Sequence, residues 1–217
     1  DNISITFHPL ETLYIHEINQ FQDSVVEMVS SVLSGDPEDW IPLEYGYQGY
    51  RKTILGPGGV RLYSGSPGDL HFNISLPGHA CQLAGAERLK DFLAYSAENR
   101  GKARRIDLAL DDYDKLITPE ELEAQFHSPN AVTHIKEIMG VKKSKRGEPE
   151  LGGATRYLGA PSSLRRLRCY DKNVESGGLI DAYRWEIQER KRAAEKAHHD
   201  LLNGDLGEVI RSRLVSL

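Results

Sequence analysis

Polar residues stand at alternate positions in the stretch 164–172, and they are Arg166, Arg168, Tyr170 and Lys172. Side chains alternate between two faces along a β-strand, so a strand here would project all four from one face. Two arginines, a lysine and a tyrosine do not make a hydrophobic core. They are typical of a surface that binds phosphates through charged groups and offers them a phenol as nucleophile.

Two further segments alternate in the same way. In 105–111 the odd positions are Arg105, Asp107, Ala109 and Asp111, and in 183–188 the polar positions are Arg184, Glu186 and Gln188. This pattern predicts half-buried antiparallel strands, each with one face under helices. If the three strands are neighbours, Asp107, Glu186 and Tyr170 converge among arginines. Two carboxylates beside a phenol suggest a divalent metal ion, Mg²⁺ or Mn²⁺, with Asp107 and Glu186 as its ligands.

Each of these assignments has a structural alternative. A tyrosine on a strand can simply pack, and each carboxylate can pair with a neighbouring arginine instead of a metal. Asp111 is either a third metal ligand or a turn residue at the end of a strand. Tyr157 is expected to be a packing or stacking residue, and His198 and His199 are expected to face solvent.

The charge of the chain is unevenly distributed. The net charge is −5, but residues 142–172 hold nine basic and three acidic residues, a net of +6, which leaves 18 basic and 29 acidic residues elsewhere. A basic patch on an acidic body can bind a polyanion at one site. The candidate phosphate-binding residues are Lys142, Lys143, Lys145, Arg146, Arg105, Arg166, Arg168, Lys172 and Arg184. The run 142–146 alone could equally be a solvated loop.

The composition is that of a soluble globular protein, with 39% hydrophobic and 27% charged residues among 217. No apolar run is long enough to cross a membrane. Cys81 and Cys169 form no metal or redox motif, which favours a reducing compartment. The chain begins at Asp1 without a methionine, so we expect an excised domain, and a removed leader stays an open alternative.

The predicted elements give an α+β fold in which helices cover one face of an antiparallel sheet and leave the other face open. Strands are expected at 3–8, 45–54, 60–63, 71–76, 105–111, 154–158, 164–172 and 183–188. Helices are expected at 13–33, 84–99, from 118, at 130–139 and at 192–202. Thr118, Pro119 and Glu121 form a capping pattern for the third helix. The chain is read as one catalytic domain, 1–217, with two related halves of about 1–115 and 116–217 as an option.

Four segments in this order resemble the replication initiation factor (Rep_trans) family. They are 105–113, 157–163, 168–172 and 183–186, and the glycines and tyrosine of 46–50 and the segment 71–81 are also similar to its amino-terminal half. The family includes rolling-circle plasmid initiators, initiators of some filamentous phages and relaxases of integrative conjugative elements.

The resemblance implies a metal-dependent nick of one DNA strand by a tyrosine, at a replication origin. Tyr170 matches the nucleophile, and Asp107 and Glu186 match acidic positions of the site. Related initiators of other families bind the metal through a His-hydrophobic-His pair, which is missing from this sequence. A carboxylate-bound metal is therefore expected. Family members are often longer, which leaves open a missing C-terminal region.

The expected activity is that of an endonuclease that nicks, holds and rejoins a DNA strand. Its partners would be single-stranded or hairpin origin DNA, a host helicase and polymerase in a prokaryotic cytoplasm, no membrane and, as an option, a second copy of the chain. The alternatives are a conjugative relaxase of the same chemistry, a non-catalytic module that binds single-stranded nucleic acid, and a metal-dependent nuclease without a covalent step.

Overall fold

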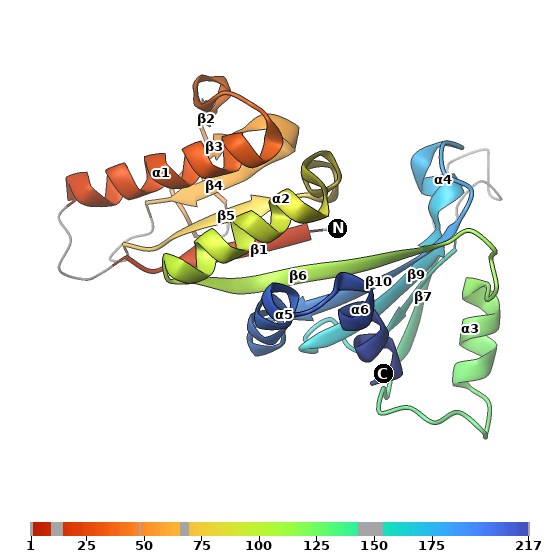
Figure 1. The fold of residues 1–217 in the computed structure, drawn as a ribbon. Helices are drawn as coiled ribbons and strands as arrows, with labels where there is room; N and C mark the ends of the chain where they lie inside the picture. Colours follow the sequence, from red (N-terminus) through yellow and green to blue (C-terminus); the bar gives the residue numbers. More distant parts are fainter. Residues whose placement is uncertain (1, 10–14, 48, 66–69, 143–153, 217) are drawn as a thin grey trace. The chain divides into compact units, whose positions relative to one another are not determined.

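The computed structural model describes residues 2–9, 15–47, 49–65, 70–142 and 154–216. The chain divides into two compact units (Figure 1). The first unit holds Asp1–Ile106 and Ala194–Gly204, and the second holds Asp107–Ala193 and Asp205–Leu217. This division differs from halves of about 1–115 and 116–217, because a C-terminal helical segment packs in the first unit. That the whole chain acts as one catalytic domain stays a prediction.

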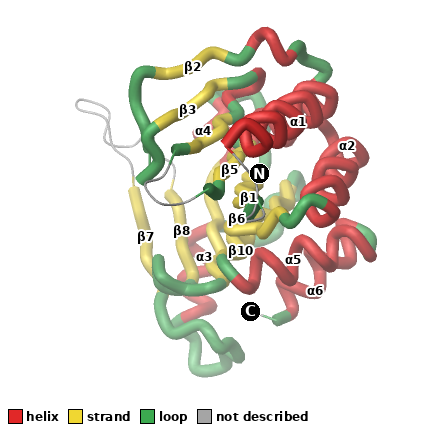
Figure 2. Tube along the Cα trace, turned by 90° about the vertical axis from the view of Figure 1, so that its left-hand side faces the viewer, coloured by secondary structure: helices red, strands yellow, loops and turns green. Residues whose placement is uncertain are grey.

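The first unit is an antiparallel sheet covered on one face by helices. Its elements are β1 (Asn2–Phe7), α1 (Ile15–Leu33), β2 (Ile41–Leu43), β3 (Lys52–Leu55), β4 (Arg61–Ser64), β5 (Phe72–Leu76) and α2 (Gly78–Glu98). Its strands lie in the order β2-β3-β4-β5-β1. α1 and α2 lie side by side (Figure 2), and their apolar residues cover Ile5, Phe7, Phe72 and Ile74, all fully buried. This burial supplies the main stabilisation of the unit.

The second unit has the same kind of sheet. β6 (Gly101–Asp112) begins in the first unit and continues into the second, followed by α3 (Pro119–Phe126), β7 (Ile138–Lys142), β8 (Ala154–Leu158), β9 (Arg165–Asp171), α4 (Lys172–Ser176), β10 (Tyr183–Arg190) and α6 (Leu206–Val215). Between β10 and α6, most of α5 (Arg192–Asn203) belongs to the first unit. Its strands lie in the order β6-β10-β9-β8-β7, and β7, β8, β9 and β10 pair in antiparallel fashion. The predicted α+β class with an open antiparallel sheet is therefore confirmed.

The two units share one topology. Each begins with a strand and a helix, continues with four consecutive antiparallel strands, and pairs the last of these with the first strand. β4 of the first unit therefore occupies the place that β9 occupies in the second. Whether the units arose from a repeat stays a prediction, since the sequence shows none.

The strand faces follow the predicted alternation in part. Leu108, Leu167 and Ile187 are at most 5% exposed, as expected for the face under helices, whereas Leu110 on the same side of β6 is 45% exposed. On that face Glu189 is fully buried and pairs with Arg165 at 2.8 Å, because an ion removed from water needs a partner. The same face carries Cys169, whose thiol pKa is raised to about 12 by burial, so it is no competing nucleophile.

The predicted helix at 130–139 is wrong. Residues 131–137 form no helix, and β7 begins at Ile138. The hydroxyls of Ser128 and Thr133 accept hydrogen bonds from nearby backbone N–H groups, which competes with helical bonding. Val132 is 99% exposed, so no apolar face is available to stabilise a helix.

Two elements of the structure, β2 and α6, were not predicted. His198 is buried, not solvent-facing, because its Nε2 lies 2.8 Å from the Leu93 carbonyl oxygen and ties α5 to α2 within the first unit. The capping box of Thr118 and Glu121 is confirmed, with both hydrogen bonds present. No helix of the described residues is long and apolar enough to cross a membrane.

Candidate active site on the second unit

The open face of the second unit carries a set of charged and aromatic side chains, which we call the charged face. Strand pairing aligns Tyr170 with Arg184 on one side and with Thr155 on the other, and aligns Arg168 with Glu186 and Tyr157. The charged face comprises Tyr157, Arg166, Arg168, Tyr170, Arg184, Glu186, Gln188, Asp107 and Asp111. The observed register of β9 and β10 therefore places Tyr170 and Glu186 on one face. This is part of the prediction that three strands bring the tyrosine and the carboxylates together.

Tyr170 is almost enclosed by this face, with only 5% of its surface exposed. The Arg168 guanidinium carbon lies 4.0 Å from the centre of the Tyr170 ring, which is a cation–π contact. Burial, and then the negative charge of Glu186, raise the pKa of Tyr170 to about 12, although Arg168 and Arg184 act in the opposite direction. The phenol is thus protonated at neutral pH and sits among groups that could change its pKa.

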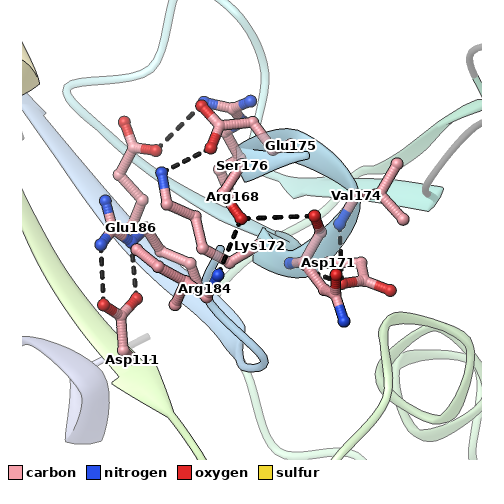
Figure 3. A network of polar contacts seen from close by, with 11 residues as sticks. Asp111, Arg168, Asp171, Lys172, Val174, Glu175, Ser176, Arg184 and Glu186 are labelled. Atoms are coloured by element: carbon pink, nitrogen blue, oxygen red, sulfur yellow. Dashed lines mark hydrogen bonds and ion pairs between the residues drawn. The ribbon is translucent and has the colours of Figure 1, made fainter. Parts of the chain in front are cut away.

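Arg184 contacts both Tyr170 and Asp111 of β6, and Figure 3 shows its pairing with Asp111. Its Nε and Nη2 donate to the two carboxylate oxygens of Asp111 at 2.6 and 2.7 Å. This bidentate pair, together with a hydrogen bond to Tyr170, raises the pKa of Arg184 and keeps it charged. Asp111 is therefore held by an arginine in this structure, and its role as a third metal ligand stays a prediction.

Two other carboxylates of the charged face are buried. Asp107 is 3% exposed and Glu186 is 4% exposed. Glu186 accepts a hydrogen bond at 3.1 Å from Arg168 Nη1, while Asp107 lies on β6 four residues before Asp111 and so on the same face. Among the described ranges, no group of three or more His, Cys, Asp or Glu side chains is placed to hold a metal ion.

Arg166 is a buried cation that no carboxylate in the described part of the chain neutralises. It is 7% exposed, its Nε donates to the Gly159 carbonyl at 3.1 Å, and its guanidinium lies 3.9 Å from the Tyr157 ring centre. Its Nη2 has no hydrogen-bond partner among the residues that the structure describes, and burial lowers the pKa of Arg166. A buried guanidinium with an unused N–H is an anion-binding group. The contact also confirms Tyr157 as a stacking residue.

Lys172 differs from the prediction that it continues the strand. β9 ends at Asp171, whose carboxylate accepts hydrogen bonds from the N–H groups of Asn173 and Val174 and so begins α4 at Lys172. The Lys172 amine pairs with Glu175 (Figure 3). It also lies 6.0 Å from the Tyr170 ring centre. It therefore stays beside the tyrosine, although it reaches that place from a helix.

The remaining predicted phosphate-binding residues lie outside the charged face as defined above or outside the described residues. Arg105 lies on β6 in the part that belongs to the first unit. Lys142 is the last residue of β7, and Lys143, Lys145 and Arg146 lie outside the described residues. Their contribution to DNA binding stays a prediction.

Sequence reasoning missed two residues beside the charged face. Glu175 acts on the pKa of Tyr170 from α4, and Thr155 is paired with Tyr170 across β8. Gln188, which was predicted on the polar side of its strand, is buried opposite Arg166. Only Glu175 had a signal, because Asp171 before a short polar stretch that ends at Gly177 is a capping pattern. Cross-strand partners cannot be read from one strand.

The comparisons with known proteins agree with this geometry. The chain is similar to a solved structure described as a rolling circle replication initiator protein from Geobacillus stearothermophilus, with a TM-score of 0.79 and 22% identity, over 100% of this chain and 83% of that one. At this identity the likeness shows a common fold. No curated protein sequence is significantly similar to the chain. The sequence pattern of the replication initiation factor family matches residues 101–215, which include β6, β8, β9 and β10 and hence every strand of the charged face, so the chain belongs to that family.

Proposed function

We propose that this protein initiates rolling-circle replication by nicking one DNA strand at an origin with Tyr170. The reaction would leave the 5′ end of the strand joined to the tyrosine and would free a 3′ hydroxyl that primes a host polymerase. A host helicase would separate the strands, and the covalent end would later be rejoined. The organism's cytoplasm is the expected compartment, since the DNA substrate, polymerase and helicase are there.

The observation that carries this proposal is the buried Arg166, which has no carboxylate partner among the described residues and lies on the same face and strand as Tyr170. An isolated buried charge is costly, and a phosphate would offset that cost. Arg166 is four residues from Tyr170, or roughly 13 Å along a strand. It would therefore bind a phosphate next to the scissile one, while Arg168 and Arg184 are close enough for the scissile phosphate itself.

The proposed step is a phosphoryl transfer. The Tyr170 oxygen forms a bond to phosphorus, the bond between phosphorus and the 3′ oxygen breaks, and that oxygen takes up a proton as the phenol loses one. Negative charge develops on the non-bridging oxygens, and Arg168 and Arg184 are the groups that would stabilise it. The ester conserves the energy of the broken bond, so the reverse step rejoins the DNA.

The raised pKa of Tyr170 is the main obstacle to this step. After burial, the negative charge of Glu186 is the second cause of the raised pKa of Tyr170. Any positive charge that binds Glu186 would remove that repulsion and lower the pKa of the phenol. Arg168 already donates to one oxygen of Glu186, which leaves the other oxygen for a second cation.

Asp107 and Glu186 are the residues that would hold a divalent metal ion. Mg²⁺ is commonly bound through one or two carboxylates, with water and substrate phosphate as the other ligands. Two buried carboxylates on one face fit this mode, while Asp111 would first have to release Arg184. The ion, Mg²⁺ or Mn²⁺, would supply positive charge for the phosphate oxygens.

An incubation with a single-stranded origin oligonucleotide tests the proposal. Denaturing electrophoresis should show cleavage in which one DNA end migrates with the protein, and mass spectrometry should place the nucleotide on the peptide that contains Tyr170. Free ends would indicate a nuclease without a covalent step. Intact DNA would indicate a binding module. A nucleotide on Tyr157 would refute the assignment of the nucleophile.

The basic run before β8 provides a separate test of DNA binding. Reversal of the charges of Lys142, Lys143, Lys145 and Arg146 should weaken binding to all sequences and flatten its salt dependence. Each lost phosphate contact should lower the log–log salt slope by roughly 0.7 for single strands. An unchanged slope would show that the run takes no part.

A further inference from the structure

The first unit contains a row of residues that corresponds to the row through Tyr170. Because β4 occupies the place of β9 in the shared topology, Tyr63 can be compared with Tyr170. The row through Tyr170 is Thr155, Tyr170, Arg184 and Asp111, and the row through Tyr63 is Thr53, Tyr63, Asn73 and Thr6. Both rows begin with a threonine and a tyrosine, and they differ at the two positions after the tyrosine.

The row through Tyr63 is uncharged. Asn73 Nδ2 donates to Thr6 Oγ1 at 3.0 Å and to Ser4 Oγ at 3.1 Å, where the other row has an arginine bound to a carboxylate. None of the strands β1 to β5 contains an aspartate or glutamate. This face therefore offers no carboxylate pair for a metal, and we do not expect Tyr63 to act as a nucleophile.

Aromatic rings gather on this face instead. The Tyr63 ring centre lies 5.7 Å from that of Tyr47 and 6.0 Å from that of Tyr50, and the latter pair is stacked. The series continues through His71, which is 5.6 Å from Tyr50, to His8 at 5.8 Å from His71. Tyr47, Tyr50, Tyr63, His71 and His8 together are called the aromatic face.

The aromatic face is partly open. Tyr63 is buried, but Tyr47 is 54% exposed and the neighbouring Tyr45 is 59% exposed. Gly46 fixes this loop, because a Cβ at Gly46 would lie 1.8 Å from the Tyr50 carbonyl oxygen. Two large aromatic side chains are thus kept at the surface by a backbone that only glycine permits, which is unusual for residues whose role is packing alone.

Positive charges lie beside these rings. Arg61 is exposed, acts on the Tyr63 phenol and stands two residues before it on β4. The Arg104 guanidinium lies within hydrogen-bonding distance of His8, at 3.1 Å. By contrast, α1 and α2 on the covered side carry six acidic and two basic residues. A polyanion is therefore attracted to the aromatic face and repelled by the helices of the same unit.

We propose that the aromatic face binds unpaired bases of single-stranded DNA, with Tyr47 as a stacking residue and Arg61 as a phosphate contact. Aromatic rings stack on any base, so such a surface holds a strand without reading its sequence. The proposal rests on the DNA-nicking function proposed for Tyr170 and assigns a second DNA contact to the chain. This second contact would also explain why the first unit has a tyrosine at the corresponding place in its sheet but lacks the arginine–carboxylate pair beside it.

Tyr47→Ala in the full 217-residue chain tests this contact. Fluorescence anisotropy with a labelled oligothymidine should show roughly a five- to hundredfold loss of affinity, the range expected for one base–aromatic stack. Tyr47→Phe keeps the ring and should bind as the unchanged protein does. The matched control is Leu83→Ala on α2, because Leu83 is also 54% exposed, and it should leave affinity unchanged.

An abasic oligonucleotide of the same length and charge separates stacking from phosphate binding. Tyr47→Ala should not alter its affinity, whereas Arg61→Gln should weaken both probes. Photocrosslinking with 5-iododeoxyuridine should label the peptide that contains Tyr47. Equal affinity of Tyr47→Ala for oligothymidine, or an equal loss on the abasic probe, would overturn the proposal.

The adduct assay keeps the two proposals distinct. Binding that depends on Tyr47 in a protein that forms no adduct would support the aromatic face and reject the nicking function. Normal adduct formation together with oligothymidine binding that does not depend on Tyr47 would reject the aromatic face alone.

Discussion

The charged face and the aromatic face belong to two units of the same strand topology, and each has a tyrosine in the same row. Beside Tyr170 the next strand supplies Arg184, bound to Asp111. Beside Tyr63 it supplies Asn73, bound to Thr6. A neutral amide and hydroxyl stabilise a sheet, but they cannot bind a phosphate as strongly or change a phenol's pKa as an ion does. The scaffold therefore positions a tyrosine, while the neighbouring charges decide what it can do.

The surroundings of the two rings differ in a second way. Tyr170 is in contact with cations, because Arg168 lies over its ring at 4.0 Å. Tyr63 is in contact with other rings. Burial raises the pKa of both phenols, and only for Tyr170 is the raised value opposed by two arginines. We infer that the first unit serves to hold DNA and the second to cut it.

The largest difference between the charged face and the aromatic face is expected when the phenol oxygen of each tyrosine, Tyr170 or Tyr63, is removed. Tyr170→Phe keeps the ring but lacks the attacking oxygen, so adduct formation should be abolished while DNA binding stays nearly normal. Tyr63→Phe is the matched control and should form the adduct at the unchanged rate. The assay is denaturing electrophoresis of labelled DNA. Nicking by Tyr170→Phe, or its loss in Tyr63→Phe, would break the comparison.

Removal of the buried carboxylates should have the next largest effect. Asp107→Ala and Glu186→Ala should each lower cleavage by about a hundredfold or more, because the metal charge on the phosphate oxygens is lost. Excess chelator should do the same to the unchanged protein. Ser75→Ala, a substitution on the corresponding strand of the first unit, should have no such effect. Undiminished cleavage in chelator would show that no metal is needed.

The pH dependence of adduct formation should follow the Tyr170 phenol. With a pKa raised to about 12, the phenolate fraction rises about tenfold for each pH unit below that value. The single-turnover rate should therefore increase with pH between about 7 and 9, with a log–log slope near one. Bound metal should shift this line toward lower pH by offsetting Glu186. A rate that is independent of pH would mean that loss of the phenol proton does not limit the step.

The smallest expected effect comes from single phosphate contacts. Arg166→Gln and Arg61→Gln should each lower the log–log salt slope of single-strand binding by roughly 0.7. Only Arg166→Gln should also slow adduct formation at saturating DNA, since Arg166 shares the strand of Tyr170. Melting temperatures would show whether either variant is merely less stable. Equal effects on the adduct rate would remove the functional distinction between the two faces.

Much of the second unit could be predicted because its strands are half-buried. Alternation of polar and apolar residues in 105–111, 164–172 and 183–188 assigned the faces, and the capping pattern at Thr118 located α3. These signals are local, since side-chain direction in a strand and hydrogen bonding at a helix start depend only on nearby residues.

The sequence by itself determined which residues share a strand face, because the period of a strand is fixed by backbone geometry. Only the tertiary structure decided which of them meet across strands. The pairing of Arg184 with Asp111, and the lack of a carboxylate beside Arg166 among the described residues, depend on neighbours distant in the chain. The match between Tyr63 and Tyr170 likewise depends on strand order, which no single segment encodes.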